Sequence, residues 1–314
     1  ATSRELQTGG TSSLCAGGNT PTYFNNIQFV SISTTGNTAD FGDLTRTGNQ
    51  MNGVSSRTRG IFATGYKGSG TGVENIIDFV TISSQGDATD FGDTSSQRSG
   101  IQPMQNSTRG ILAGGQDHPA GNSVDIIDYI TMASTGDAID FGDLVRAVNA
   151  QGSTNSPTRM VVVGGRTPSV YYEEIQSITI ASKGNAVDIG LWAWEVIESN
   201  KGTISSGHRG FIGATGPNIA VIPTIASMNV TDGGSCTVFG DLTFARRNCG
   251  GTSSKTRGLY AGGMTDVFGD NYALNNIDFI TLSTTGDAQD FGDLGTKTRG
   301  QACASNCHGG LGGY

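Results

Sequence analysis

The chain has 314 residues, of which 49 are glycine and 7 are proline, too few of either for a collagen-like protein. It has no run of about 18 apolar residues, which excludes a membrane-spanning helix. Charged residues make up 15% and hydrophobic residues 35%, so the chain is neither charged enough for typical disorder nor apolar enough for insertion into a membrane. The net charge of −8 is spread along the chain without basic blocks, which argues against a nucleic-acid partner.

Two sequence markers recur at one period. The tripeptide Phe-Gly-Asp begins at residues 41, 91, 141, 239 and 291, and a degenerate copy begins at residue 189, so that successive spacings are 50, 50, 48, 50 and 52. An arginine that precedes an apolar segment recurs with spacings of 50, 50, 50 and 48 at Arg59, Arg109, Arg159, Arg209 and Arg257. This agreement predicts a repeat architecture.

Each period is predicted to contain four short strands. The first covers residues 51–57 and their equivalents. The second ends in small residues and covers 14–18, 60–65, 110–115, 160–165, 210–215 and 258–263. The third covers 27–33, 76–83, 126–133, 175–181, 225–230 and 277–283. The fourth carries the Phe-Gly-Asp tripeptide and follows a Thr-Gly-Asp or Thr-Gly-Asn turn, whose residues tolerate the positive φ of tight hairpins.

The third strands are apolar at both parities. Ile77 and Phe79 point to one face of the sheet, while Ile76, Val80 and Ile82 point to the other. A strand buried on both faces fits a sheet covered on both sides by its neighbours, as in a β-propeller. The sequence therefore predicts an all-β fold, a β-propeller of four-stranded blades.

Six third strands predict six blades in a single domain of residues 1–314. The approximate repeats are 1–45, 46–95, 96–145, 146–193, 194–244 and 245–294. Residues 295–314 are expected to supply the first strand of the N-terminal blade, closing the ring and covering its exposed edge. A seventh blade assembled from both termini is the alternative.

The period, the four strands and the paired glycines resemble the kelch repeat of β-propellers. Residues 59–65 match its double-glycine strand, Asp78-Phe79 its aromatic third strand, and Phe91 the position where kelch repeats carry tryptophan. Strings such as IDFITLSTTGDAQDFGDL (277–294) and STRGILAGG (107–115) are similar to kelch-like repeats in virion proteins of marine tailed phages, particularly cyanophages. The resemblance implies a fibre, baseplate or capsid-decorating component.

Repeated polar residues are expected to serve the scaffold. The arginines listed above would line a channel and bind an anion, or would pair with the repeated carboxylates and tie blades together; the second role is favoured because the arginine repeats from blade to blade. The carboxylates are Asp43, Asp93, Asp143, Asp241 and Asp293.

No metal or other cofactor is predicted. Asp-Phe-Gly lacks the rest of the kinase signature, the acids around it lack a calcium-binding order, and Cys303, Cys307 and His308 lack a second half of a zinc site. Five cysteines, an odd number, do not indicate a disulfide framework.

Aromatic residues in the variable connections between second and third strands are the candidates for a binding face. Exposed rings of this kind stack on sugars or pack against proteins, and the alternative is that they pack their own loops. The fourth repeat breaks the pattern and holds both tryptophans of the chain. The candidates are Tyr66, His118, Tyr171, Tyr172, Trp192, Trp194, Phe268 and Tyr272.

The function expected from these features and from the resemblance is non-enzymatic. The partners would be other virion proteins or a host-surface glycan, with a homo-oligomer in the particle as a further option. No signal peptide is expected from the first 20 residues, and the resemblance implies assembly in host cytoplasm and release in an extracellular particle. The alternatives are a carbohydrate-active propeller enzyme and a cellular kelch-type adaptor.

Overall fold

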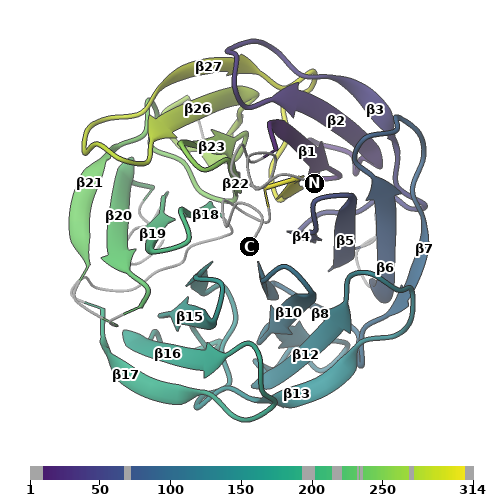
Figure 1. Cartoon of the computed structure of the whole chain (residues 1–314), viewed down its shortest axis with the longest axis vertical. Helices are drawn as coiled ribbons and strands as arrows, with labels where there is room; N and C mark the ends of the chain where they lie inside the picture. The colour runs from purple at the N-terminus through teal and green to yellow at the C-terminus, as the bar shows by residue number, and fades with distance from the viewer. Residues whose placement is uncertain are drawn as a thin grey trace, which may run out of the picture.

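The computed structural model describes residues 10–66, 72–192, 202–213, 221–231, 233, 236–268 and 272–307. These residues form strands and connecting turns, and no helix occurs among them. The strands build six four-stranded antiparallel sheets arranged around an axis (Figure 1). The molecule is a six-bladed β-propeller, as predicted, and the seven-blade alternative is wrong.

Each sheet runs from an inner strand near the axis to an outer strand at the rim (Figure 1). The first two sheets are β28 (Ala302–Ser305), β1 (Ser12–Ala16), β2 (Asn26–Ser31) and β3 (Ala39–Asp43), then β4 (Asn52–Ser55), β5 (Arg59–Tyr66), β6 (Val73–Thr81) and β7 (Thr89–Asp93). The third and fourth are β9 (Gln102–Gln105), β10 (Arg109–Ala113), β12 (Ile126–Thr131) and β13 (Ile139–Asp143), then β14 (Gly152–Asn155), β15 (Arg159–Val163), β16 (Glu174–Thr179) and β17 (Val187–Leu191). The fifth and sixth are β18 (Thr203–Ser205), β19 (Arg209–Ile212), β20 (Thr224–Asn229) and β21 (Thr237–Asp241), then β22 (Gly250–Ser253), β23 (Arg257–Ala261), β26 (Asn276–Thr281) and β27 (Gln289–Asp293). Two short ribbons are added by β8 (Arg98–Ser99) with β11 (Gln116–Asp117) and by β24 (Met264–Thr265) with β25 (Tyr272–Ala273).

The first sheet draws strands from distant parts of the chain. Its inner strand β28 pairs antiparallel with β1, and Cys303 lies opposite Cys15 in the register. The sixth sheet contacts the first through the same bonds that join other neighbouring sheets: Gly36 N–H donates to the Phe291 carbonyl at 2.8 Å, as Gly86 N–H does to the Phe41 carbonyl at 2.9 Å.

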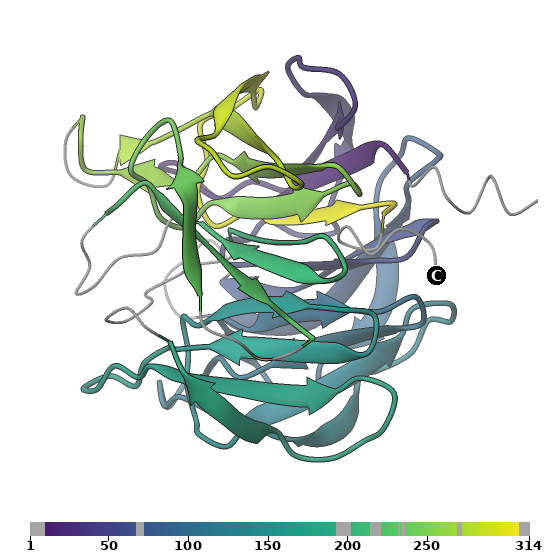
Figure 2. The same cartoon turned by 60° about the vertical axis from the view of Figure 1, so that its left-hand side comes forward.

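The hydrophobic core lies between neighbouring sheets, which pack face against face (Figure 2). Consecutive residues of β5 show this most directly. Ile61 and Phe62 point to opposite faces of the sheet, and both are completely buried. Phe62 packs with Leu14 of the first sheet, whereas Ile61 packs with Leu112 of the third. Every blade therefore depends on the presence of its neighbours.

The Phe-Gly-Asp tripeptide is a docking site for the next blade. The ring of Phe91 packs edge-on against Phe79 with centroids 5.8 Å apart. Gly92 has a φ of 144°, and a Cβ there would lie 2.5 Å from the backbone carbon of Gly136 in the following blade. The backbone N–H of Asp93 donates to the Asp137 carboxylate at 3.0 Å. The glycine is needed because two backbones meet at this point.

Candidate functional site

The variable connections gather on one face of the propeller. Because strands within each sheet are antiparallel, the loops from second to third strands lie at the same end as the linkers from each fourth strand to the next blade. The contact between Phe244 of one linker and Phe268 of one such loop, 5.7 Å between ring centroids, shows that the two kinds of segment meet. This loop face carries the aromatic candidates.

Three aromatic rings and a lysine meet on the loop face at the sixth blade. The rings of Phe268 and Tyr272 lie edge to face at 5.6 Å, and 54% and 39% of their respective surfaces are exposed. Lys297 Nζ lies 4.2 Å from the centroid of the Tyr272 ring and contacts its hydroxyl. The ring of the half-buried Phe244 lies edge to face against Phe268, and Val267, which precedes Phe268 in the chain, is 64% exposed. We call Phe244, Val267, Phe268, Tyr272 and Lys297 the sixth-blade patch.

The sixth-blade patch has the chemistry of a ligand-binding surface. Exposed aromatic faces stack on sugar rings or pack against protein side chains, and a neighbouring ammonium group favours a partner with acceptor oxygens. Phe268 and Tyr272 are the two predicted aromatic residues with exposed side chains among those that the structure describes.

Tyr66 and His118 are half-buried and pack against each other. Their rings are edge to face with centroids 5.0 Å apart, which joins the loop of the second blade to that of the third. His118 Nε2 also lies 3.3 Å from the hydroxyl of Ser99. Burial lowers the pKa of His118 below its ordinary value, and the neighbouring Asp117 carboxylate opposes this effect. These two rings support the loops rather than standing free.

Tyr171 and Tyr172 are also half-buried, in the loop of the fourth blade. Tyr172 packs on the core between the third and fourth blades, and the guanidinium of Arg146 lies 4.4 Å from its ring centroid. Arg166 lies 6.0 Å from the ring centroid of Tyr171. Both arginine contacts hold the tyrosines against the body of the propeller.

The expectation that Trp192 belongs to an exposed binding surface is wrong. Its side chain is 2% exposed and packs between the fourth and fifth blades with Val161 and Met228. Ile189, which replaces the phenylalanine of the tripeptide in this blade, contacts the same cluster. Trp192 thus supplies an aromatic ring to a blade interface that lacks the usual one. Trp194 lies outside the described residues.

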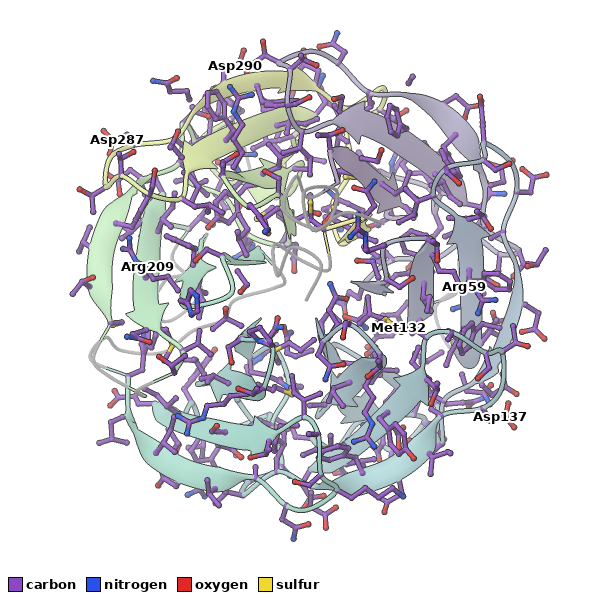
Figure 3. The ribbon with its side chains drawn as sticks, viewed as in Figure 1. Arg59, Met132, Asp137, Arg209, Asp287 and Asp290 are labelled. Carbon is purple, nitrogen blue, oxygen red and sulfur yellow. The ribbon has the colours of Figure 1, made fainter. Side chains whose placement is uncertain are left out.

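Four of the five repeated arginines bridge neighbouring blades by bonds to backbone carbonyls, whereas Arg209 bonds to a hydroxyl of its own blade. Arg109 Nη1 donates to the carbonyls of Ile180 and Ala181 at 2.8 and 2.9 Å, and its guanidinium lies 5.0 Å from the ring centroid of Tyr129. Arg59 reaches Met132 of the next blade in the same way, at 3.0 Å (Figure 3). Arg159 and Arg257 bond to the carbonyls of Thr231 and Ser33, while Arg209 bonds to the Ser227 hydroxyl.

The alternative in which these arginines pair with the Phe-Gly-Asp carboxylates is wrong. Among the described residues, no ion pair joins one of these arginines to one of these carboxylates. The carboxylates lie near the rim, where Asp43, Asp93, Asp143 and Asp241 are exposed and Asp293 is half-buried. Their backbone N–H groups bond to the turn side chains of the next blade, namely Asp87, Asp137, Asn185, Asp287 and Asn37. Figure 3 shows Asp137 and Asp287 at this outer rim.

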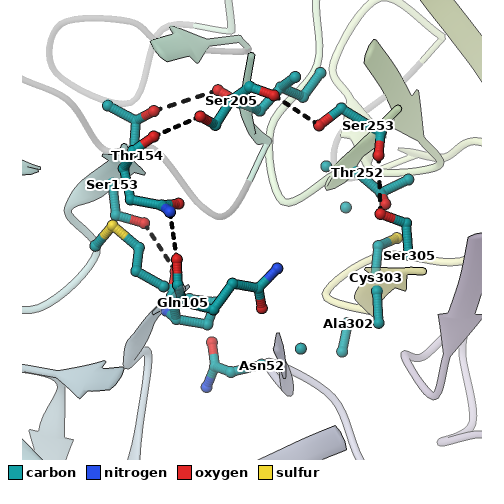
Figure 4. A pocket seen from close by; sticks show the side chains of 18 of the residues that line it. Asn52, Gln105, Ser153, Thr154, Ser205, Thr252, Ser253, Ala302, Cys303 and Ser305 are labelled. Atoms are coloured by element: carbon teal, nitrogen blue, oxygen red, sulfur yellow. Dashed lines mark hydrogen bonds between the residues drawn. The ribbon is translucent and has the colours of Figure 1, made fainter. Parts of the chain in front are cut away.

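The axis of the propeller is a narrow channel bordered by the six inner strands, with a cavity volume of about 60 Å³. A circle of polar residues surrounds it, and Figure 4 shows most of this circle, from Gln105 through Ser205 and Ser253 to Ser305. We call this circle the axial belt; it consists of Ser55, Gln105, Asn155, Ser205, Ser253 and Ser305. Each belt residue bonds to the preceding one, as when Ser305 Oγ donates to the Ser253 carbonyl at 2.8 Å. The N–H of Ser305 then reaches Ser55 Oγ at 3.3 Å and completes the circle.

Sequence reasoning missed the axial belt, although its members recur at spacings of 50, 50, 50, 48 and 52.

Sequence reasoning also missed two fully buried ion pairs, Arg98 with Asp128 and Arg246 with Asp278. These pairs join the linker after one blade to the third strand of the next. Burial lowers the pKa of Arg98, an effect that Asp128 opposes. The signal for them was an arginine in the linker about 30 residues before an aspartate in the third strand.

No family model and no curated protein matches the chain. Within the part of the chain that the structure describes, no three His, Cys, Asp or Glu residues group as they would around a metal ion. No helix with the length and hydropathy of a membrane span occurs among the same residues. The sixth-blade patch is the candidate site because it brings two exposed aromatic rings and a lysine together.

Proposed function

We propose that the protein is a non-catalytic structural component of a phage particle, and that its sixth-blade patch binds a host-surface glycan or another virion protein. The observation that carries the binding role is the pair of adjacent exposed rings, Phe268 and Tyr272, with Lys297 beside them. Singly exposed aromatics are ordinary on protein surfaces, whereas a cluster of them is typical of interfaces. The virion setting is supported by the resemblance of the repeat sequence.

The test is binding of the full chain to an array of surface glycans and to the remaining proteins of a purified particle. Replacing Phe268 and Tyr272 together with alanine should weaken binding about tenfold or more, since both stacking surfaces are lost. Val238→Ala is the matched control, because Val238 is 60% exposed on β21, away from the patch. Equal affinity of the double variant and the wild type would contradict the assignment of the patch.

The same assay separates binding from catalysis. We expect the bound glycan to be recovered unchanged after prolonged incubation, as a binding protein requires. Release of smaller or oxidised sugars that depends on the protein would instead support a carbohydrate-active enzyme, since catalysis consumes its ligand. Absence of the protein from purified particles would contradict the virion role while leaving the binding result intact.

A further inference from the structure

Two cysteine thiols from distant parts of the sequence meet in the first sheet. Cys15 lies on β1 and Cys303 on β28, and their Sγ atoms are 3.0 Å apart. Both side chains are buried, at 4% and 8% exposure, and both are reduced thiols. They are 288 residues apart in the chain, so the spacing of the cysteines gives no sign of this contact.

The backbone around the two thiols suits a covalent bond. Cys15 and Cys303 are direct partners in the antiparallel register. Such partners have Cα atoms about 4.5–5.5 Å apart, within the range of about 4.4–6.8 Å that disulfides adopt. A cross-link would therefore form with little movement of either strand.

We propose that Cys15 and Cys303 are an oxidation site, at which exchange with a small organic disulfide forms a cross-link between β1 and β28. The thiolate of Cys303 attacks one sulfur of the reagent, whose S–S bond breaks and releases one thiol. Cys15 then loses its proton, and its thiolate attacks the Cys303 sulfur of the mixed disulfide, which forms the cross-link and releases the second reagent thiol. In total the two cysteines lose two protons and two electrons, and one disulfide molecule is reduced to two thiols.

Cys303 is the member of the pair that borders the axial channel, where Figure 4 labels it. The contact with Cys15, together with burial, raises the pKa of Cys303 well above its ordinary value. Because the thiolate is the reactive form, exchange is slow at neutral pH and faster in alkali.

The other thiols differ from this pair in geometry rather than in acidity, because Cys249 and Cys307, like Cys303, have raised pKa values. Burial raises the pKa of Cys249, which precedes β22, to about 11, and that of Cys307 to about 11. Cys236 packs between the fourth and fifth blades. The contact of Cys15 with Cys303 is the one Sγ–Sγ contact that joins two described cysteines. Oxidation is therefore directed to this pair.

The cross-link would tie together the two strands whose pairing joins residues 12–16 to residues 302–305. A bond between residues that far apart in sequence restricts the unfolded chain strongly, which stabilises the folded state. We expect the oxidised protein to unfold at a higher temperature than the reduced protein.

The experiment is incubation of the folded chain with bis(2-hydroxyethyl) disulfide at about pH 9, where thiolate formation is favoured. Mass spectrometry should show loss of two hydrogens and a bond between the tryptic peptides 5–46 and 300–314, with fragmentation assigning it to Cys303 rather than Cys307. The melting temperature should rise by several degrees and return after reduction. Cys236→Ser is the matched control and should behave as the wild type.

Cys15→Ser and, separately, Cys303→Ser should abolish both the cross-link and the rise in melting temperature. Should either variant fail to fold, the peptide map of the wild type still decides the question. A bond between any other two cysteines, a stable mixed disulfide with the reagent, or full recovery of free thiols would overturn the proposal. None of these outcomes bears on binding by the sixth-blade patch.

Discussion

Single glycines in this protein are required for two different reasons. Gly92 and Gly136 have similar φ values, 144° and 150°, which side-chain-bearing residues rarely adopt. A Cβ on Gly136 would meet no atom within 4 Å, whereas one on Gly92 would press on the backbone of the next blade. The tripeptide glycine is thus needed for conformation and for space, and the turn glycine for conformation alone.

This difference gives a matched pair of substitutions. Gly136→Ala should lower the free energy of unfolding by about 1–2 kcal/mol through backbone strain. Gly92→Ala should cost about 1–3 kcal/mol more, because the blades must also move apart. Urea denaturation of both variants measures the comparison. Equal losses would mean that the contact between Gly92 and Gly136 carries no steric restriction.

Neighbouring blades are held together by a small set of repeated contacts between strands. In four blades, an arginine at the start of the second strand reaches a carbonyl just after the next blade's third strand, as Arg109 of β10 does after β16. A backbone amide of the outer strand bonds to the next blade's turn, as Asp143 does to Asn185. These bonds complement the hydrophobic packing between the sheets and fix their relative orientation.

Arg109→Ala should lower the free energy of unfolding by about 2 kcal/mol, because two carbonyls lose a charged donor and the Tyr129 ring loses its cation–π contact. Arg146→Ala should cost less than about 1 kcal/mol, since its side chain is 44% exposed and its ion pair with Glu174 is screened by water. Thermal and urea unfolding distinguish the two. Unchanged stability of Arg109→Ala, with loss of ligand binding, would contradict the scaffold role.

At the scale of the whole molecule, the axial belt links all six inner strands in one circle. Each belt bond crosses from one blade to the next, so every blade is held at the axis as well as at the rim. The bond between Ser305 and Ser55 joins the inner strand of the first sheet to that of the second. The belt therefore fixes the radius at which the six sheets pack.

Ser253→Ala and Ser305→Ala should each lower the free energy of unfolding by about 1 kcal/mol, because each leaves a buried carbonyl without its hydroxyl donor. Ser84→Ala, at an exposed turn position, is the control and should leave stability unchanged. Chemical denaturation monitored by circular dichroism provides the measurement. If the belt variants match the control, the circle of bonds does not stabilise the propeller.

The sequence by itself determined the repeat, the strands and the number of blades. The period of about 50 residues can be recognised directly from the linear sequence, and so can the third strands, which are apolar at both odd and even positions. Because neighbouring strands run in opposite directions, the sequence also predicted which loops lie on one face of the propeller. Of the aromatic candidates on that face, Phe268 and Tyr272 are the exposed ones.

Only the tertiary structure decided which side chains face solvent and which meet across blades. Trp192 is buried because the fourth blade lacks its tripeptide phenylalanine, and the space it fills is bounded by residues of another repeat. The contact of Cys15 with Cys303 depends on a strand pairing that spans nearly the whole chain. Burial and proximity of this kind are set by the packing of sheets distant in sequence, so no local pattern encodes them.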